Sequence, residues 1–303
     1  MAAFRINLPA TSANLGAAFD SAAVALDFYL TVEAKPAETF SIAATGRNAD
    51  VCGRVEGNLI LDTYAALLQR EGRAVPPLAL RVDNQIPLGM GCGSSAAGRL
   101  AAVALAAHFG GLNWDDDAIL AEACALEGHP DNAAACWLGG MVVAAEGGQG
   151  ERILVARVDP PVGWRALIVL PDMSLPTTEA RAVLPASYTR ADVVANLQAA
   201  SLLGLAFAQG RGELLQAAMR DRIHQPYRAA MCSLLPRLLP LAGAVGILGV
   251  ALSGAGPSVL LIVEAEEMAA AVGLAQATME GEGQVEVLQA RFANCGAAAG
   301  RER

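Results

Sequence analysis

The chain has 303 residues, 54% of them hydrophobic and 17% charged, which is enough to bury a substantial core in what we predict to be two domains. A formal net charge of −9 without any basic run argues against nucleic acid or an anionic membrane surface as a partner. The first residues lack the apolar segment of a signal peptide, and the six cysteines form no C-x-x-C pair, so we expect reduced thiols and a cytoplasmic protein.

Strand and helix patterns alternate along the first half of the chain. Phe4, Ile6 and Leu8 alternate and predict a strand that stops at Pro9. The predicted elements that follow are strands over 26–34 and 40–44, a helix over 58–69, a strand over 78–82, helices over 96–109 and 115–127, and strands over 139–146 and 153–158. A P-P-V-G segment at 160–163 is the predicted boundary between a domain of residues 1–160 and a domain of residues 161–303.

The second half opens with an apolar strand over 164–170, followed by a mostly helical region over 190–222. A strand over 246–252 leads through S-G-A-G-P into another apolar strand, and by itself this turn is typical of a hairpin. A helix over 265–279 and a strand over 285–290 complete the pattern, which predicts an α/β sandwich.

A glycine loop is the most informative segment, reading P-L-G-M-G-C-G-S-S-A-A-G at residues 87–98. Glycines at alternate positions 89, 91 and 93 allow positive φ, and the alanine-rich helix begins directly after them. Such a loop directs unpaired N–H groups and the positive end of a helix dipole at one point, where phosphate is the usual occupant. Ser94 and Ser95 stand where a hydroxyl can cap the helix, or bind phosphate or a metal.

Three interpretations of this loop compete. A tight turn with a good cap explains one or two glycines, but explains three alternating glycines and two serines poorly. A P-loop is absent because no lysine follows. Gly91, Gly93 and Ala96 fit the dinucleotide motif G-x-G-x-x-A, but Pro87 precedes the loop and no acidic strand end follows, so nucleotide phosphate on a non-Walker loop is favoured.

Further polar groups have open interpretations at this point. Asn14 and Asp20, in T-S-A-N-L-G-A-A-F-D, indicate either an ordinary turn or a carboxylate aimed into a cleft. In E-G-H-P-D-N, Glu127 could hold Mg²⁺ or end a solvated helix, and His129 could contact substrate or cap the helix. Arg181 and Arg228 could each grip a carboxylate, although surface arginines are the commoner case.

Three of these segments together resemble the motifs of the GHMP small-molecule kinases: P-A-T-S-A-N-L-G-x-x-F-D, P-x-x-x-G-x-G-S-S-A-A and L-S-G-A-G-P-S. E-G-H-P-D-N and H-Q-P-Y-R narrow the resemblance to the homoserine kinase branch of that family, and the match runs from Leu8 to Val263. The resemblance implies an α+β two-domain GHMP kinase fold, with an N-terminal ribosomal-protein-S5-like α/β domain and a C-terminal ferredoxin-like α/β sandwich, commonly as a homodimer. It also implies ATP-dependent phosphorylation of the L-homoserine hydroxyl in threonine biosynthesis.

The same resemblance implies roles for individual residues. ATP and Mg²⁺ are the implied cofactors, with Ser95 and Glu127 on the metal and Glu122 as a less favoured substitute for Glu127. The implied amino-acid site consists of Asn14, Asp20, His129, Asn132, Arg181 and Arg228, where Asp20 suits the ammonium and the two arginines suit the carboxylate. Adenine is placed near the helix that begins at Asn58, and the phosphates are wrapped by Pro87, Leu88, Gly89, Met90, Gly91, Cys92, Gly93, Ser94, Ser95, Ala96 and Ala97.

Departures from the family pattern affect the expected chemistry. Asn132 stands where some relatives place an aspartate base, so we expect a mechanism without a strong protein base in which Asn132 orients the hydroxyl. Cys92 replaces a usual leucine, and Ala17–Ala18 replaces a more flexible segment, which leaves the loop intact but can reshape the substrate side. The alternatives are a kinase for mevalonate or another alcohol, an NAD(P) dehydrogenase, and a non-catalytic ATP-binding protein.

Overall fold

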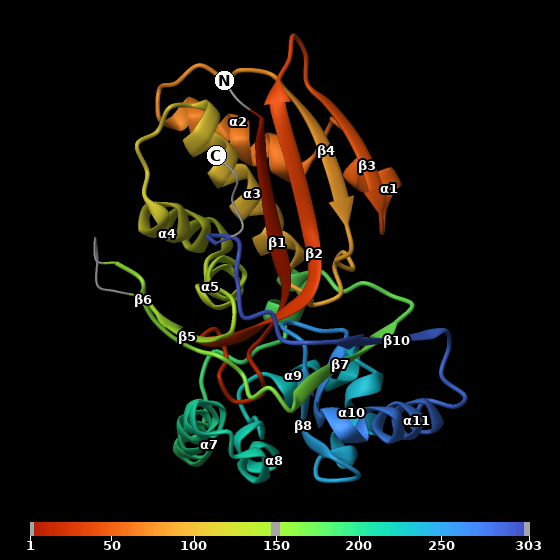
Figure 1. The fold of residues 1–303 in the computed structure, drawn as a ribbon. Helices are drawn as coiled ribbons and strands as arrows, with labels where there is room; N and C mark the ends of the chain where they lie inside the picture. The colour runs from red at the N-terminus through yellow and green to blue at the C-terminus, as the bar shows by residue number, and fades with distance from the viewer. Residues whose placement is uncertain (1–2, 147–151, 300–303) are drawn as a thin grey trace.

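Two sheets and their covering helices make up the computed structural model, which describes residues 3–146 and 152–299 (Figure 1). The first sheet has the strand order β3-β4-β2-β5-β6, with β1 paired to β2, and the second has the order β10-β7-β9-β8. The strands of the first sheet are β1 (Phe4–Ala13), β2 (Ala22–Pro36), β3 (Ser41–Gly46), β4 (Leu78–Asn84), β5 (Met141–Ala145) and β6 (Leu154–Val158). Its helices are α1 (Ala49–Cys52), α2 (Leu59–Arg70), α3 (Ser94–Phe109), α4 (Asp116–Glu127) and α5 (Asp131–Leu138).

The first strand does not stop at Pro9, as the alternation predicted. It continues to Ala13 and stays paired with β2, and the register shifts between Pro9 and Ala10. A bulge tolerates proline, which has no N–H for the ladder, so the chain passes through it without leaving the sheet. This continuation places Thr11 and Ser12 at the end of the sheet that meets the second sheet.

Helix α3 is alanine-rich because it is enclosed by other elements. It packs against α2, α4 and β1, and nearly all its residues from Ala96 to Ala106 are buried. Small side chains let a helix approach its neighbours closely on every side. The predicted cap of α2 is confirmed, since the Asn58 side chain accepts from the N–H groups of Ile60 and Leu61.

Three strands of the second sheet, β7, β8 and β9, are buried on both faces, which explains their uninterrupted apolar sequences, whereas the edge strand β10 is partly exposed. Its strands are β7 (Trp164–Pro171), β8 (Ile247–Leu252), β9 (Val259–Glu264) and β10 (Val285–Ala290). Along β7, Ile168 and Leu170 join the core shared with the first sheet, whereas Leu167 and Val169 join a separate core under the last helices. The two long helices around it are α7 (Arg190–Gln209) and α11 (Met268–Thr278). The short helices are α6 (Thr177–Ala182), α8 (Leu215–Ala218), α9 (Gln225–Arg228) and α10 (Leu234–Leu238). Four 3₁₀ turns lie at Gly212–Leu214, Ala229–Met231, Leu239–Leu241 and Ala265–Glu267.

After β10 the chain returns to the first sheet. Phe292 bridges to Leu26, and the N–H of Ala293 donates to the carbonyl of Ala25 at 2.9 Å. The predicted division at residue 160 falls between β6 and β7, but the closing segment packs on the first half of the chain. The domain limits of 1–160 and 161–303 stay a prediction.

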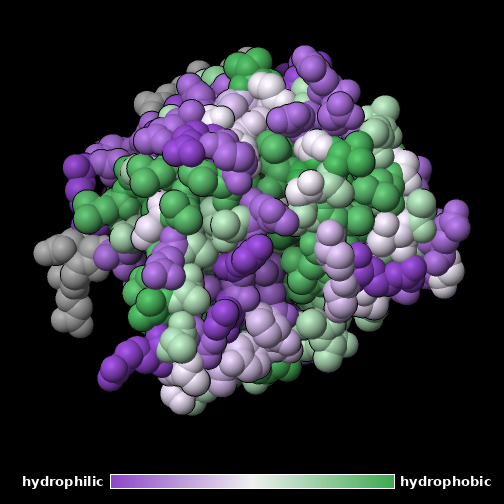
Figure 2. Space-filling model, turned by 90° about the horizontal axis from the view of Figure 1, so that it is seen from below, coloured by the Kyte–Doolittle hydropathy of each residue, from purple (hydrophilic) through white to green (hydrophobic). Residues whose placement is uncertain are grey.

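Helix α7 is long and apolar enough to cross a membrane, and 22% of that apolar window is buried. Its inner face belongs to the folded domain, because Asn196 donates to the carbonyl of Ala17 at 2.6 Å and Phe207 lies in the core. Its outer face carries exposed apolar side chains, which we call the α7 face: Val193, Val194, Leu197, Leu202 and Leu205. Figure 2 shows a group of apolar side chains on the side where Figure 1 places α7.

Three loops meet where the two sheets join. The Ser253 hydroxyl donates to the carbonyl of Gly91 at 2.7 Å and lies 2.9 Å from the hydroxyl of Ser12, with which it shares a hydrogen bond. The N–H of Gly254 donates to the carbonyl of Ala13 at 3.1 Å. Backbones approach so closely that a Cβ on Gly91, whose φ is +74°, would lie 2.0 Å from the Ser253 carbonyl oxygen.

We therefore expect Gly91→Ala to lower the free energy of unfolding by about 2 to 5 kcal/mol, because left-handed strain and a backbone clash add together. The matched control is Gly72→Ala, where φ is +63° and nothing lies within 4 Å of the added carbon. This control should lose only about 1 to 2 kcal/mol from the left-handed conformation. Chemical denaturation measures both, and equal losses would contradict the close approach.

Candidate active site

A cavity of about 380 Å³ opens between the two halves of the molecule. Its walls come from segments far apart in the chain: the loop at 14–20, the glycine loop, the turn at 127–132, helix α6, helix α9 and the turn at 254–256. The three sequence motifs therefore converge on one space. All six residues predicted for the amino-acid site line this cavity, as do both residues predicted for the metal: Asn14, Asp20, His129, Asn132, Arg181, Arg228, Ser95 and Glu127.

The glycine loop has the geometry of an anion site. Gly89, Gly91 and Gly93 all have positive φ, and Gly93 is the cap of α3. A Cβ on Gly93 would lie 1.9 Å from the hydroxyl of Thr11, so only glycine fits. The first N–H groups of α3 have no partner within the helix, and Ser94 and Ser95 face the cavity there.

The residues predicted to bind the nucleotide fall into three groups. Leu88, Gly89, Gly91, Gly93, Ser94, Ser95, Ala96 and Asn58 line the cavity, next to apolar wall residues Leu59, Ile60 and Val82. Pro87 and Met90 line a second depression on the other side of Leu88. The side chains of Cys92 and Ala97 are buried in the core below the loop.

Ser95 and Glu127 lie side by side at the start of α3. The Ser95 hydroxyl donates to the Glu127 carboxylate at 2.7 Å, and Arg99 Nη1 lies 3.0 Å from the same carboxylate. Carboxylate and hydroxyl oxygens are hard donors, so this pair fits Mg²⁺ beside a phosphate. Glu122 lies elsewhere, where its carboxylate accepts two hydrogen bonds from Arg70 at 2.8 and 2.9 Å.

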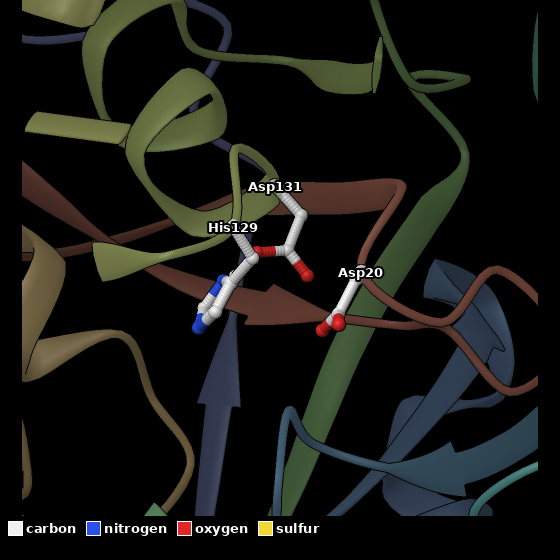
Figure 3. Close-up of side chains that lie close together, drawn as sticks. All are labelled: Asp20, His129 and Asp131. Atoms are coloured by element: carbon white, nitrogen blue, oxygen red, sulfur yellow. Dashed lines mark hydrogen bonds and ion pairs between the residues drawn. The ribbon is translucent and has the colours of Figure 1, made fainter. Parts of the chain in front are cut away.

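His129 and Asp131 form a close pair at the turn that follows α4 (Figure 3). His129 Nδ1 lies 2.6 Å from the Asp131 carboxylate, which also accepts from the N–H of Asn132. Burial opposes the charged imidazole, but the hydrogen bond and charge of Asp131 raise the pKa of His129 above its usual value. The Thr11 hydroxyl donates to the Asn132 side-chain oxygen at 2.6 Å and fixes the amide.

Asp20 is held by an arginine and by the loop that carries it. Arg181 donates two parallel hydrogen bonds to its carboxylate, at 2.6 and 3.0 Å. Asn14 accepts from the Asp20 N–H at 2.9 Å and donates to the carbonyl of Gly254 at 2.8 Å. The Asn14 amide thus connects the loop to the C-terminal turn, so its measured contacts are structural.

Asp20, His129 and Asp131 have ligand atoms within 4.8 Å of one another, as in a metal site. Figure 3 shows the three side chains directed at the same space. Asp20 pairs with Arg181, and Asp131 is hydrogen-bonded to His129. Glu127 is likewise paired with Arg99, so a neighbouring basic side chain is common to both groups of possible metal ligands.

Arg228 is the unusual charge in the cavity. Its side chain is 1% exposed, and it donates to the Ala180 carbonyl at 2.9 Å and to His224 Nδ1 at 3.1 Å. Burial and the charge of Arg181 lower its pKa. Across residues 3–146 and 152–299 no carboxylate forms an ion pair with Arg228, although the charges of Asp20 and Asp221 favour its charged form, so the site holds a buried cation that an anionic ligand can pair with.

Sequence reasoning missed four residues that organise this site: Thr11, Phe19, Asp131 and His224. Each stands inside a motif that we singled out, so the signal was present, but their partners are distant in sequence. Phe19 is an example, because the guanidinium groups of Arg181 and Arg228 lie over its ring. Their central carbons are 5.5 Å and 5.4 Å from the ring centroid.

Comparisons with known proteins agree with this geometry. Residues 58–140 match the model of the GHMP kinases N terminal domain, and residues 205–276 match that of the GHMP kinases C terminal. The chain is 45% identical to the homoserine kinase of Solibacter usitatus, over 86% of this chain and 85% of the relative. The chain belongs to the GHMP kinases.

Solved structures of this family share the fold. A homoserine kinase from Cytophaga hutchinsonii superposes with a TM-score of 0.80 over 97% of this chain and 96% of that one, at 24% identity. A putative homoserine kinase from Listeria monocytogenes superposes with a TM-score of 0.77 over 97% of each chain, at 29% identity. The predicted two-domain α+β fold is confirmed. This GHMP kinase is a phosphotransferase with an alcohol acceptor, which excludes the dinucleotide interpretation of its glycine loop.

Proposed function

We propose that this GHMP kinase transfers the γ-phosphoryl group of ATP to the side-chain hydroxyl of L-homoserine, giving O-phospho-L-homoserine for threonine biosynthesis. The observation that carries the proposal is that one cavity combines a phosphate loop with a carboxylate, Asp20, and a buried cation, Arg228. An acceptor that matches both charges is an amino acid. The similarity to homoserine kinases supports the same acceptor.

ATP fits the half of the cavity formed by the glycine loop and α2. The N–H groups at the start of α3 would bind its phosphates, and the apolar wall beside Asn58 suits a flat base. Ser95 and Glu127 would hold Mg²⁺, which would neutralise charge on the transferred phosphoryl group. Arg99 keeps the Glu127 carboxylate in place from the other side.

The amino acid would enter by exchanging partners with the Asp20–Arg181 ion pair. Its ammonium would take the Asp20 carboxylate, and its own carboxylate would bind Arg181 and Arg228. One internal ion pair is thereby replaced by two intermolecular ones. An acceptor such as mevalonate, which has a carboxylate but no ammonium, would draw Arg181 from the half-buried Asp20 and leave that carboxylate without a cation, so the pair selects against it.

The acceptor hydroxyl would lie near Asn132. Its amide is fixed by Thr11 and cannot take a proton, so catalysis depends on positioning and charge stabilisation, and the proton passes to the phosphate or to solvent. The hydrogen bond and charge of Asp131 raise the pKa of His129 and so favour its charged form on this side of the cavity.

The protein would act in the cytoplasm as a homodimer. All six cysteines are free thiols, as expected in a reducing compartment. The dimer contact that we propose is the α7 face, because residues 193–210 carry no charge and the exposed face is apolar. Two copies that each carry a net charge of −9 repel one another least through an uncharged contact.

The first measurement is ADP release from Mg-ATP with L-homoserine, with mevalonate, and without any acceptor. We expect turnover only with L-homoserine, and Arg228→Ala or Asp20→Ala should lower kcat/KM for it by about 100-fold or more because each removes the partner of a substrate charge. Turnover with another alcohol alone would contradict the acceptor assignment. ATP binding without turnover would indicate a binding protein.

Substitution of two glutamates, Glu127 and Glu122, tests which of them binds the metal. Glu127→Gln should weaken the Mg²⁺ dependence of turnover, raising the Mg²⁺ concentration for half-maximal rate by about 10-fold or more since one charged ligand is lost. Glu122→Gln is the matched control, because Glu122 is bonded to Arg70 outside the cavity. A Glu122 variant with the stronger Mg²⁺ defect would overturn the assignment.

Substitution of Asn132 tests whether the reaction proceeds without a protein base. Asn132→Asp places an acidic group beside the acceptor hydroxyl, next to Asp131 and the phosphates, and we expect slower turnover because like charges repel. Faster turnover that requires the deprotonated carboxylate in the pH profile would contradict a base-free reaction.

Light scattering tests the dimer. We expect a dimer for the native protein, and a monomer for Leu197→Glu combined with Leu205→Glu, whose positions are 62% and 53% exposed on the α7 face. Val162→Glu, at a position 86% exposed between β6 and β7, should remain dimeric. A native monomer, or a dimer that survives the double substitution, would refute this interface.

A further inference from the structure

His224 is fully buried beside the amino-acid site but does not line the cavity. It precedes α9, the short helix that carries Arg228. Its ring lies between two parts of the site: Nδ1 is 3.1 Å from Arg228 Nη1, and Nε2 is 2.9 Å from the carbonyl of Gly16. No proposed chemical step uses this histidine, yet it contacts both the cation of the site and the substrate loop.

The neighbours of the ring determine where its hydrogen lies. A guanidinium has only donors, so His224 Nδ1 must accept from Arg228. The hydrogen is then on Nε2, which donates to the Gly16 carbonyl. The imidazole is neutral in this arrangement, since burial and the charge of Arg228 lower the pKa of His224 despite the Asp221 carboxylate, which lies 3.6 Å from Nε2 and raises it.

Both ends of this connection are rigid. Gly16 has φ +81°, and a Cβ there would lie 2.0 Å from the carbonyl oxygen of Met219, so the loop backbone is wedged against the second half of the chain. Phe19, three residues later, stacks on the His224 ring with 5.2 Å between centroids and 28° between planes. Arg228 is fixed on its other edge by the Ala180 carbonyl.

We propose that His224 is a positioning residue for the substrate carboxylate. Its Nδ1 accepts from the guanidinium of Arg228 and holds it at the angle needed for the carboxylate. Its Nε2–H donates to the Gly16 carbonyl, and this bond sets the tautomer that leaves Nδ1 free to accept. This inference rests on the proposed function, since it concerns binding of an amino acid.

Two substitutions separate the two hydrogen bonds. In His224→Asn the amide oxygen takes the place of Nδ1 and can still accept from Arg228, whereas the bond to Gly16 is lost. In His224→Gln the amide nitrogen reaches the place of Nε2 and can donate to Gly16, whereas the acceptor for Arg228 is lost. Each variant is therefore the control for the other.

We expect His224→Gln to raise the KM for L-homoserine by about 10-fold or more, because a hydrogen bond to a charged group is lost. His224→Asn should keep that KM within about threefold of the native value, and both should leave the KM for ATP within about twofold, since the histidine is remote from the glycine loop. Equal KM values for L-homoserine in the two variants would overturn the proposal. So would parallel losses for both substrates, which indicate a merely structural role.

A second measurement needs neither turnover nor a stable glutamine variant. In the native protein labelled with ¹⁵N-histidine, NMR should show a protonated Nε2 and an unprotonated Nδ1 for His224, assigned by loss of the signal in His224→Asn. A protonated Nδ1 together with normal homoserine turnover would contradict this inference alone. Absence of homoserine-dependent turnover in the native protein would contradict the proposed function. It would also contradict the role of His224 in positioning Arg228 for that substrate.

Discussion

The contact of Ser253 with Gly91 and Ser12 is the constraint on which the site depends. It joins the end of the first strand, the phosphate loop and the turn between β8 and β9 through backbone atoms that approach within hydrogen-bond distance. Glycine at position 91 makes that approach possible. Because the phosphate loop is hydrogen-bonded to the C-terminal turn, both sides of the cavity are joined next to the loop, an arrangement that suits the positioning needed for phosphoryl transfer.

Charge compensation explains the rest of the cavity. Asp20 pairs with Arg181 and Glu127 with Arg99, and Asp131 is hydrogen-bonded to His129, so each acidic group has a basic partner before any ligand arrives. Arg228 is the exception, with two neutral acceptors and no ion pair among the described residues. A buried cation of this kind is expensive to maintain unless a ligand anion completes it. The cavity is thus prepared for a ligand that brings an anionic group to Arg228.

The sequence predicted most elements to within a few residues, because the apolar periodicity of α2, α4 and the second sheet reflects burial that the structure confirms. It was wrong about Pro9, where the strand continues through a bulge that only the partner strand reveals. The short helices α5, α9 and α10 were not predicted, since packing rather than periodicity stabilises them. The predicted site residues were gathered into one cavity, yet the partners of Asn14 and Arg228 could not be foreseen.

The sequence by itself determined the class of protein, since glycine spacing, the serines after it and the flanking motifs express local backbone requirements that are visible one segment at a time. Tertiary structure alone decided which charges pair. Arg181 meets Asp20 across 161 positions, and His224 meets Gly16 across 208. Such contacts depend on how the two sheets join, which no local pattern encodes. The amino-acid site forms only where the two sheets join, whereas twelve consecutive residues of the sequence are enough to predict the phosphate loop.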